Sequence, residues 1–242
     1  MVIAQQEAVE AGLDEEKTIT RQRRPLSRNG LVWQRLRGMP RFWVGAIAFG
    51  LIVVLSIVGP FLTPWSITDR DVYNMGMGPT LRHWFGTNSI GQDIFAQTMA
   101  GLQKSLIIGL VAGILGTLLA AVIGSVAGYV GGVTDKVISW FTHLLLVVPS
   151  FFILILLSPL FKSLSWIALT FFLAIFSWMI MAQVVRNQTR SLRNRDFVRA
   201  ARYMGLPTRK ILSRHILPNI ASLLIIDVTL GIVSMIMSET SL

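Results

Sequence analysis

The chain has 242 residues, of which 53% are hydrophobic and only 14% are charged, and its mean hydropathy is +0.62. A soluble domain carries about 25% charged residues, so this composition excludes an ordinary soluble protein and indicates a bilayer protein. The net charge of +10 falls mainly in two segments beside apolar blocks, which argues against nucleic-acid binding, and the lack of cysteine excludes disulfides and thiolate metal sites.

The N-terminal segment is polar. Residues 1–42 contain no apolar stretch, and an acidic patch gives way to a basic one. We expect a cytoplasmic tail whose arginines lie against anionic lipid headgroups. Each arginine near the surface would contribute about 1 kcal/mol to the free energy of membrane binding. For residues 1–20, a solvated tail without any partner is an equally good interpretation.

Five apolar blocks follow, each close to the ~20 residues that cross the hydrocarbon core. They cover about residues 43–62, 105–130, 137–160, 165–185 and 220–237. The fold class predicted from them is an all-α integral membrane protein, with a transmembrane domain over residues 43–242.

Lysine and arginine counts predict the orientation. The tail and residues 186–219 hold most of the basic residues. By the positive-inside rule both are cytoplasmic, and residues 63–104 then form an external loop.

Small residues recur at steps of four in the second apolar block. The glycines expected to pack against another helix are Gly109, Gly113, Gly124 and Gly128. This spacing places glycines on one helix face and allows a neighbouring backbone to approach closely.

The cytoplasmic segment 186–219 is patterned as two short helices. Asp196 is the predicted N-cap of the first, and Gly205 ends it because glycine adopts left-handed geometry without a steric penalty. Pro207 suits the first turn of the second helix, and Pro218 disfavours helix at Leu217.

The first of these helices has an apolar stripe formed by Phe197, Ala200, Ala201 and Met204. Arg195, Arg199 and Arg202 are expected on its other face. Such a helix suits docking into a groove on another protein, or alternatively lies on lipid headgroups, and periodicity alone does not separate the two.

Asp227 is an ionisable residue inside the last apolar block, where such residues are functional candidates by default. It is expected either to face a pathway through the membrane or to hydrogen-bond a neighbouring helix. The three histidines fall in separate segments, so no metal site is predicted. The sequence has no phosphate-binding Gly-Lys-Ser/Thr motif, so ATP hydrolysis is expected on another chain and not here.

The cytoplasmic segment resembles the EAA loop of ABC importer permeases. The matching residues are Arg199-Ala200-Ala201, Gly205 and His215-Ile216-Leu217-Pro218. The spacing between these motifs agrees with the family pattern, whereas Arg199 replaces its glutamate and His215 replaces an aliphatic residue.

Further motifs are similar to those of oligopeptide and dipeptide importers, and the best match is their C-type permease. They are His83-Trp84-Phe85-Gly86-Thr87-Asn88, Gly91-Gln92-Asp93, Gly101-Leu102-Gln103-Lys104-Ser105-Leu106, Gly128-Tyr129-Val130-Gly131-Gly132 with Asp135, and Pro149-Ser150. Gln92 stands where the family has arginine, and His143 stands where it more often has aspartate.

The resemblance implies a six-helix, multi-pass subunit of the bacterial inner membrane with a cytoplasmic N-terminus. A second permease would complete a peptide pathway that works by alternating access. Two cytosolic ATPases would carry ATP and magnesium, and an extracytoplasmic peptide-binding protein would deliver substrate. No cofactor is expected on this chain itself. The residues assigned to ATPase coupling are Phe197, Arg199, Ala200, Ala201, Met204, Gly205, Leu217 and Pro218.

The resemblance also leads us to expect a sixth helix beyond the five apolar blocks, and therefore a C-terminally truncated chain. Two alternative functions follow. One is a non-transporting remnant or assembly partner, and the other is an ABC permease for nickel or another small solute.

Overall fold

The computed structural model describes residues 36–147, 149, 152–153, 155–156 and 166–241. Apart from an isolated β-bridge between Thr87 and Asp93, the regular structure of these residues is helical, which confirms the predicted all-α class. Residues 1–35 of the predicted tail lie outside the described residues. So does much of the second half of the predicted span 137–160, including Ser150 of the Pro149-Ser150 motif.

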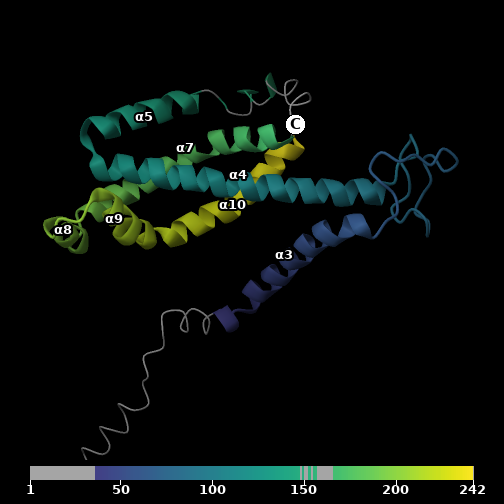
Figure 1. Ribbon diagram of the computed structural model, residues 1–242, viewed down its shortest axis with the longest axis horizontal. Coiled ribbons are helices and arrows are strands. Elements are labelled where there is room, and N and C mark those ends of the chain that lie inside the picture. The colour runs from purple at the N-terminus through teal and green to yellow at the C-terminus, as the bar shows by residue number, and fades with distance from the viewer. Residues whose placement is uncertain (1–35, 148, 150–151, 154, 157–165, 242) are drawn as a thin grey trace, which may run out of the picture. The chain divides into compact units, whose positions relative to one another are not determined.

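Four helical segments in the described part of the chain are long and apolar enough to cross a bilayer. The first comprises α3 (Pro40–Val58) and the 3₁₀ turn η1 (Gly59–Phe61), and the others are α4 (Ile94–Val130), α7 (Trp166–Arg193) and α10 (Ala221–Thr240) (Figure 1). The third predicted span begins in α5 (Gly132–Val147), which is 16 residues long as described. The chain is a multi-pass membrane protein.

The chain divides into two compact units, residues 1–54 and 55–242. The first unit contains most of α3, whose apolar side chains are largely exposed. Proline suits the first position of a helix, where its missing N–H has no intrahelical partner, and Pro40 takes that position in α3. The second unit holds all the other described helices and both candidate sites.

Helix α4 is the central element of the second unit and spans 37 residues, about 55 Å at 1.5 Å per residue. It begins well before Ser105, the start expected from hydropathy, because Asp93 caps it. The Asp93 Oδ1 atom accepts a 2.7 Å hydrogen bond from the backbone N–H of Ala96. The loop before α4 is therefore shorter than the predicted 63–104, and the first turns of α4 lie within that predicted loop.

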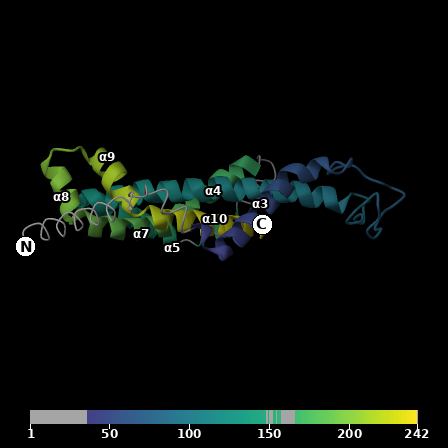
Figure 2. The same cartoon turned by 90° about the horizontal axis from the view of Figure 1, so that it is seen from below.

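Helices α7 and α10 both pack along α4 (Figures 1 and 2). A Cβ atom on Gly124 or Gly128 would lie 2.4 Å from a backbone carbonyl oxygen of α7, whereas one on Gly109 or Gly113 would meet Ile232 of α10 at about 3 Å. The four glycines thus serve two interfaces, with α10 and with α7, whereas one packed interface was expected from their spacing. Glycine allows the backbones to approach closely at both.

Helix α5 is tied to α7 by an ion pair. Arg186 donates to both carboxylate oxygens of Asp135, from Nε to Oδ1 and from Nη2 to Oδ2, the latter over 2.7 Å. A two-point contact of this kind fixes the orientation of both groups as well as their distance. It holds the first turn of α5 against the C-terminal part of α7.

Candidate coupling surface and membrane cavity

The segment after α7 folds as two short helical arms. The first arm is α8 (Asp196–Tyr203), and the second joins α9 (Thr208–Ile211), the π-helical turn η2 (Leu212–Ile216) and the 3₁₀ turn η3 (Leu217–Asn219). The expected helix–turn–helix is therefore present. It lies at the end of α4 opposite to the loop of residues 62–93 (Figure 1).

The predicted N-cap of α8 is wrong by one residue. Arg195 takes the N-cap position and its side chain makes no capping hydrogen bond, while Asp196 lies in the first turn. A carboxylate in the first turn still interacts favourably with the positive end of the helix dipole. Pro207 is likewise shifted, because it forms the N-cap of α9 and not its first turn.

The predicted glycine stop is confirmed. Gly205 has a φ of +74°, and its N–H donates to the carbonyl of Arg202 over 3.0 Å. The N–H of Leu206 donates to the carbonyl of Ala201 over 3.2 Å. Together these bonds form a Schellman motif, which satisfies the last carbonyls of α8 and reverses the chain toward α9.

The inner side of the two arms is an apolar cluster formed by Val198, Ala201, Ile211 and Ile216, all at most 1% exposed. Tyr129 near the end of α4 and Leu192 near the end of α7 pack against this cluster. The arms are therefore attached to two membrane helices through one continuous core.

Ala201 differs from the expectation that it contacts a partner, because it is fully buried within its own chain. Its small side chain lets α8 approach the second arm. The sequence missed Val198, which is one residue away from the predicted stripe and packs beside Ala201.

The outer side of α8 is exposed and part apolar, part cationic. Phe197, Ala200 and Met204 project outward, with Met204 70% exposed, and they follow a spacing of three and four residues. Arg199 and Arg202 are also exposed. We refer to these five residues as the α8 outer face, and its apolar stripe has no cover within the described residues.

Leu217 and Pro218 lie in η3 and lead the chain into α10. Leu217 is half-buried and packs against the main core cluster around Trp178 and Val185. Pro218 is exposed and is the second residue of the turn. Leu217 therefore anchors the second arm to the core, and neither residue belongs to the α8 outer face.

The loop of residues 62–93 is organised around the buried side chain of His83. The sequence placed His83 in a family motif but did not predict its contacts. The Nδ1 atom of His83 lies 2.8 Å from Asp93 Oδ2, and its Nε2 atom lies 3.4 Å from Asp71 Oδ2. The Trp65 ring stacks on the imidazole at a centroid distance of 4.7 Å. Asp93 thus caps α4 with one oxygen and holds the loop with the other.

Several contacts hold the pKa of Asp71 below its usual range. The largest cause is the hydrogen bond from the Asn74 side chain, over 3.0 Å, and burial opposes it. His83, the N–H of Tyr73 and the charge of Arg82 lower the pKa further.

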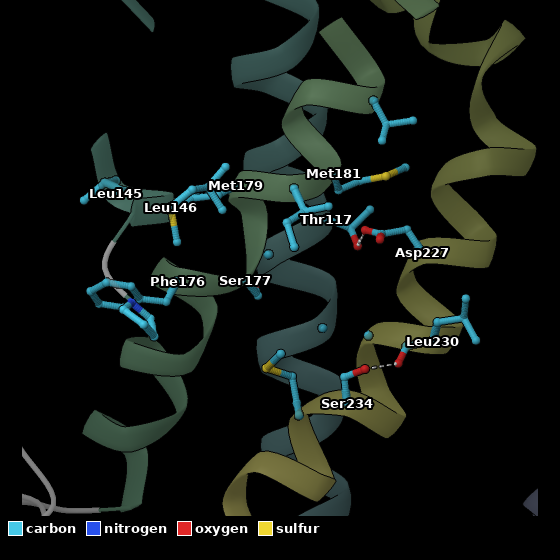
Figure 3. Close-up of a pocket in the computed structure, with 17 residues that line it drawn as sticks. Thr117, Leu145, Leu146, Phe176, Ser177, Met179, Met181, Asp227, Leu230 and Ser234 are labelled. Carbon is cyan, nitrogen blue, oxygen red and sulfur yellow. Dashed lines mark hydrogen bonds between the residues drawn. The ribbon is translucent and has the colours of Figure 1, made fainter. Parts of the chain in front are cut away.

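A cavity of about 470 Å³ lies among α4, α5, α7 and α10 (Figure 3). Its walls are mostly apolar, with Leu145, Phe176 and Met181 among them, and Asp227 of α10 is the only ionisable residue among its described lining. Thr117 of α4 donates a 2.6 Å hydrogen bond from Oγ1 to Asp227 Oδ2. The expected helix–helix hydrogen bond of Asp227 is therefore present, and Asp227 also lines the cavity. That Asp227 faces a pathway through the membrane stays a prediction.

Two more hydroxyls line this cavity, those of Ser177 in α7 and Ser234 in α10. The sequence pointed to neither them nor Thr117, because a serine or threonine in an apolar helix commonly bonds its own backbone. Their shared placement depends on three helices far apart in the sequence.

Comparison with known proteins gives two family matches. Residues 120–242 match the family described as binding-protein-dependent transport system inner membrane component. Residues 27–79 match the family described as the N-terminal TM domain of oligopeptide transport permease C.

Individual relatives point the same way. The chain is 42% identical to the oligopeptide transport system permease protein OppC of Mycobacterium tuberculosis over 217 residues, which cover 89% of this chain and 75% of that protein. It is 30% identical to OppC of Bacillus subtilis, over 86% of this chain and 68% of that protein. It is 31% identical to the dipeptide transport system permease protein DppC of Bacillus subtilis, over 87% of this chain and 65% of that protein.

Proposed function

Because this chain belongs to the family of inner membrane components of binding-protein-dependent transport systems, we propose that it forms half of the membrane pathway of an ATP-driven peptide importer. Relatives named for oligopeptide and for dipeptide transport both cover most of the chain, which favours peptides over nickel or another solute. The same matches favour a transporter subunit over a non-transporting remnant.

The proposed partners are a second permease, two cytosolic ATPases and an extracytoplasmic peptide-binding protein. The ATPases would bind ATP and magnesium, while this chain would supply neither nucleotide chemistry nor a cofactor. The protein would lie in the bacterial inner membrane with its N-terminus and the α8 outer face in the cytoplasm, and with residues 62–93 outside.

The observation that carries the coupling proposal is the division of α8 into two sides. Its outer face offers an exposed apolar stripe with flanking arginines, a shape and chemistry suited to a groove on a partner. Its inner side is buried against Tyr129 of α4 and Leu192 of α7. A displacement of α8 by the ATPases would therefore move the cytoplasmic ends of two membrane helices, which is what alternating access requires.

The role of each predicted coupling residue follows from this division. Phe197, Ala200 and Met204 would contact the ATPase directly. Ala201 and Gly205 would shape α8, the first by close packing and the second by ending the helix. Arg199, in the position where the family has glutamate, would favour carboxylates on the partner groove.

Co-purification tests this proposal. The chain is co-expressed with its neighbouring transporter subunits, and the ATPases that accompany it are measured for the unaltered chain, Ala200→Glu and Ser213→Glu. Both substituted positions are exposed, but only Ala200 belongs to the α8 outer face.

We expect Ala200→Glu to release the ATPases because it places a charge in the apolar stripe, and Ser213→Glu to retain them. Retention of the ATPases by Ala200→Glu at the unaltered level contradicts the docking role. Peptide uptake by the reconstituted complex then checks the substrate class.

A further inference from the structure

We propose that the Asp227 cavity binds an ammonium group of the transported peptide during its passage, an inference that rests on the proposed import of peptides. The cavity has one carboxylate in a mainly apolar wall (Figure 3). A carboxylate in a membrane protein's interior is costly to keep charged, and it marks a cation partner or an ion pathway. Within the described residues, no cationic side chain lines the cavity or pairs with Asp227.

The hydrogen-bond directions around the cavity are the specific reason for proposing an ammonium group. Thr117 donates its hydroxyl proton to Asp227 Oδ2, over 2.6 Å. Ser177 donates to the carbonyl of Ala174 over 3.0 Å, and Ser234 donates to the carbonyl of Leu230 over 3.1 Å. A hydroxyl has a single proton to donate, so these three groups have only acceptor lone pairs left for a ligand.

Asp227 adds a further acceptor. Its Oδ2 atom is bonded to Thr117, while its Oδ1 atom accepts no hydrogen bond from the described residues. The polar part of the cavity therefore presents acceptors alone. An alkylammonium has three donors and no acceptor, so it matches this wall in both charge and hydrogen-bond direction.

The remaining lining suits the rest of a small peptide without selecting a sequence. Leu145, Phe176 and Met181 offer apolar contact, and methionine adapts its shape to different side chains. A volume of about 470 Å³ falls within the usual range for small-ligand pockets. The cavity thus combines one charge-specific contact with permissive surroundings.

The first test uses the complete transporter in lipid vesicles. A hydrophobic carbodiimide labels membrane carboxylates, and the extent of labelling at Asp227 is read by mass spectrometry with tri-alanine, with N-acetyl-tri-alanine, or with no peptide. Glu239 is the internal control, since it is a second carboxylate of α10 bonded to a hydroxyl of α4, Ser105 at 2.8 Å, and it does not line the cavity.

We expect tri-alanine to slow the labelling of Asp227 several-fold and N-acetyl-tri-alanine to leave it unchanged, with Glu239 unaffected by either peptide. N-acetyl-alanyl-lysine, whose only ammonium is on the side chain, distinguishes a site for any ammonium from one for the peptide N-terminus. Equal labelling of Asp227 with and without every amine-bearing peptide overturns the proposal. That result would also follow if Asp227 pairs with a cation of the second permease.

The second test is uptake of tri-alanine by the complete transporter carrying Asp227→Asn or Glu239→Gln. Asparagine keeps an oxygen for the Thr117 hydroxyl, but it removes the charge and replaces the second acceptor oxygen by an NH2 donor. We expect about a tenfold loss of uptake for Asp227→Asn, the effect of losing one charge-assisted hydrogen bond, and no such loss for Glu239→Gln.

The two proposals fail in different ways. If the unaltered transporter takes up no peptide, the proposed function is wrong and this inference falls with it. If it takes up tri-alanine and Asp227→Asn does so equally well, peptide import stands and the ammonium site is wrong.

Discussion

Asp135 in α5 and Arg186 in α7, 51 positions apart, form a two-point ion pair near the end of α7. Their side chains are 15% and 24% exposed, so the pair is mostly shielded from water. Replacing Arg186 by glutamine leaves Asp135 without its partner, and we expect a loss of about 1–3 kcal/mol in stability. The melting temperature of the detergent-solubilised protein measures this loss.

Arg190→Gln is the comparison, because Arg190 lies about one turn further along α7, is exposed, and acts on Asp135 through its charge without a hydrogen bond. A melting temperature for Arg186→Gln equal to that of Arg190→Gln would show that the pair adds nothing to stability. A double change, Asp135→Asn with Arg186→Gln, should recover part of the loss because no single charge is left buried.

Gly128→Ala should separate α4 from α7. The new Cβ atom would lie 2.4 Å from the backbone carbonyl oxygen of Arg186, which cannot move without shifting α7. Overpacking of this kind costs about 1–3 kcal/mol. Gly101→Ala in the same helix meets no atom within 4 Å, so it should be neutral or stabilising, since alanine is the better helix former. Thermal unfolding of the two variants side by side checks both expectations, and equal melting temperatures would contradict them.

Gly205→Ala should loosen the end of α8 through backbone strain alone. A Cβ atom at this position has open space, but the φ of +74° is unfavourable for alanine by about 1–2 kcal/mol. Hydrogen exchange at the Leu206 amide, which donates to the Ala201 carbonyl, should become faster. Gly205→Asn should have a smaller effect, because asparagine tolerates left-handed geometry better. Similar slow exchange in all three proteins would argue against the glycine stop.

Acidification should destabilise the loop of residues 62–93. The pKa of Asp71 in the folded loop lies below the ordinary value of 3.8, chiefly because of the Asn74 hydrogen bond. The resulting stabilisation is complete above the ordinary pKa and is lost as the pH falls through the lowered, folded pKa. Fluorescence of Trp65, which stacks on His83, should report this opening as the pH falls below the ordinary carboxyl pKa and through the lowered pKa of the folded loop.

Asn74→Ala provides the comparison for this titration. Removing the main cause of the lowered pKa should move the opening to higher pH. Asp69→Asn changes an exposed carboxylate in the same loop and should leave the midpoint where it is. A midpoint unaffected by Asn74→Ala would assign the transition to a different group.

The sequence predicted those features of the coupling segment that depend on local backbone chemistry. Gly205 was predictable because a positive φ at a helix end favours glycine. The burial of Val198 instead of Phe197 was not predictable, because α8 has apolar residues on two adjacent sides. Which side faces the protein's own core depends on Tyr129 and Leu192, far away in the sequence.

The same distinction applies to the membrane helices. Hydropathy located the four spans found among the described residues, but it placed the start of α4 too late because the cap formed by Asp93 lies in a polar stretch. The sequence identified Asp227 as an ionisable residue within an apolar block. It did not predict the cavity around Asp227, whose hydroxyls come from α4, α7 and α10. Contacts of this kind leave no periodic signal, and the pairing of Asp135 with Arg186 belongs to the same class.

Helix α8 is only eight residues long, about 12 Å, and its buried and exposed apolar residues lie on adjacent sides of the same two turns. The same two turns of backbone rigidly connect two pairs of residues. The buried pair is Val198 and Ala201, and the exposed pair is Phe197 and Ala200. The apolar cluster of the two arms lies between the α8 outer face and the ends of α4 and α7. Close-packed side chains of this kind have low compressibility. A displacement of α8 would therefore be transmitted to the ends of both membrane helices without being absorbed by the side chains between them.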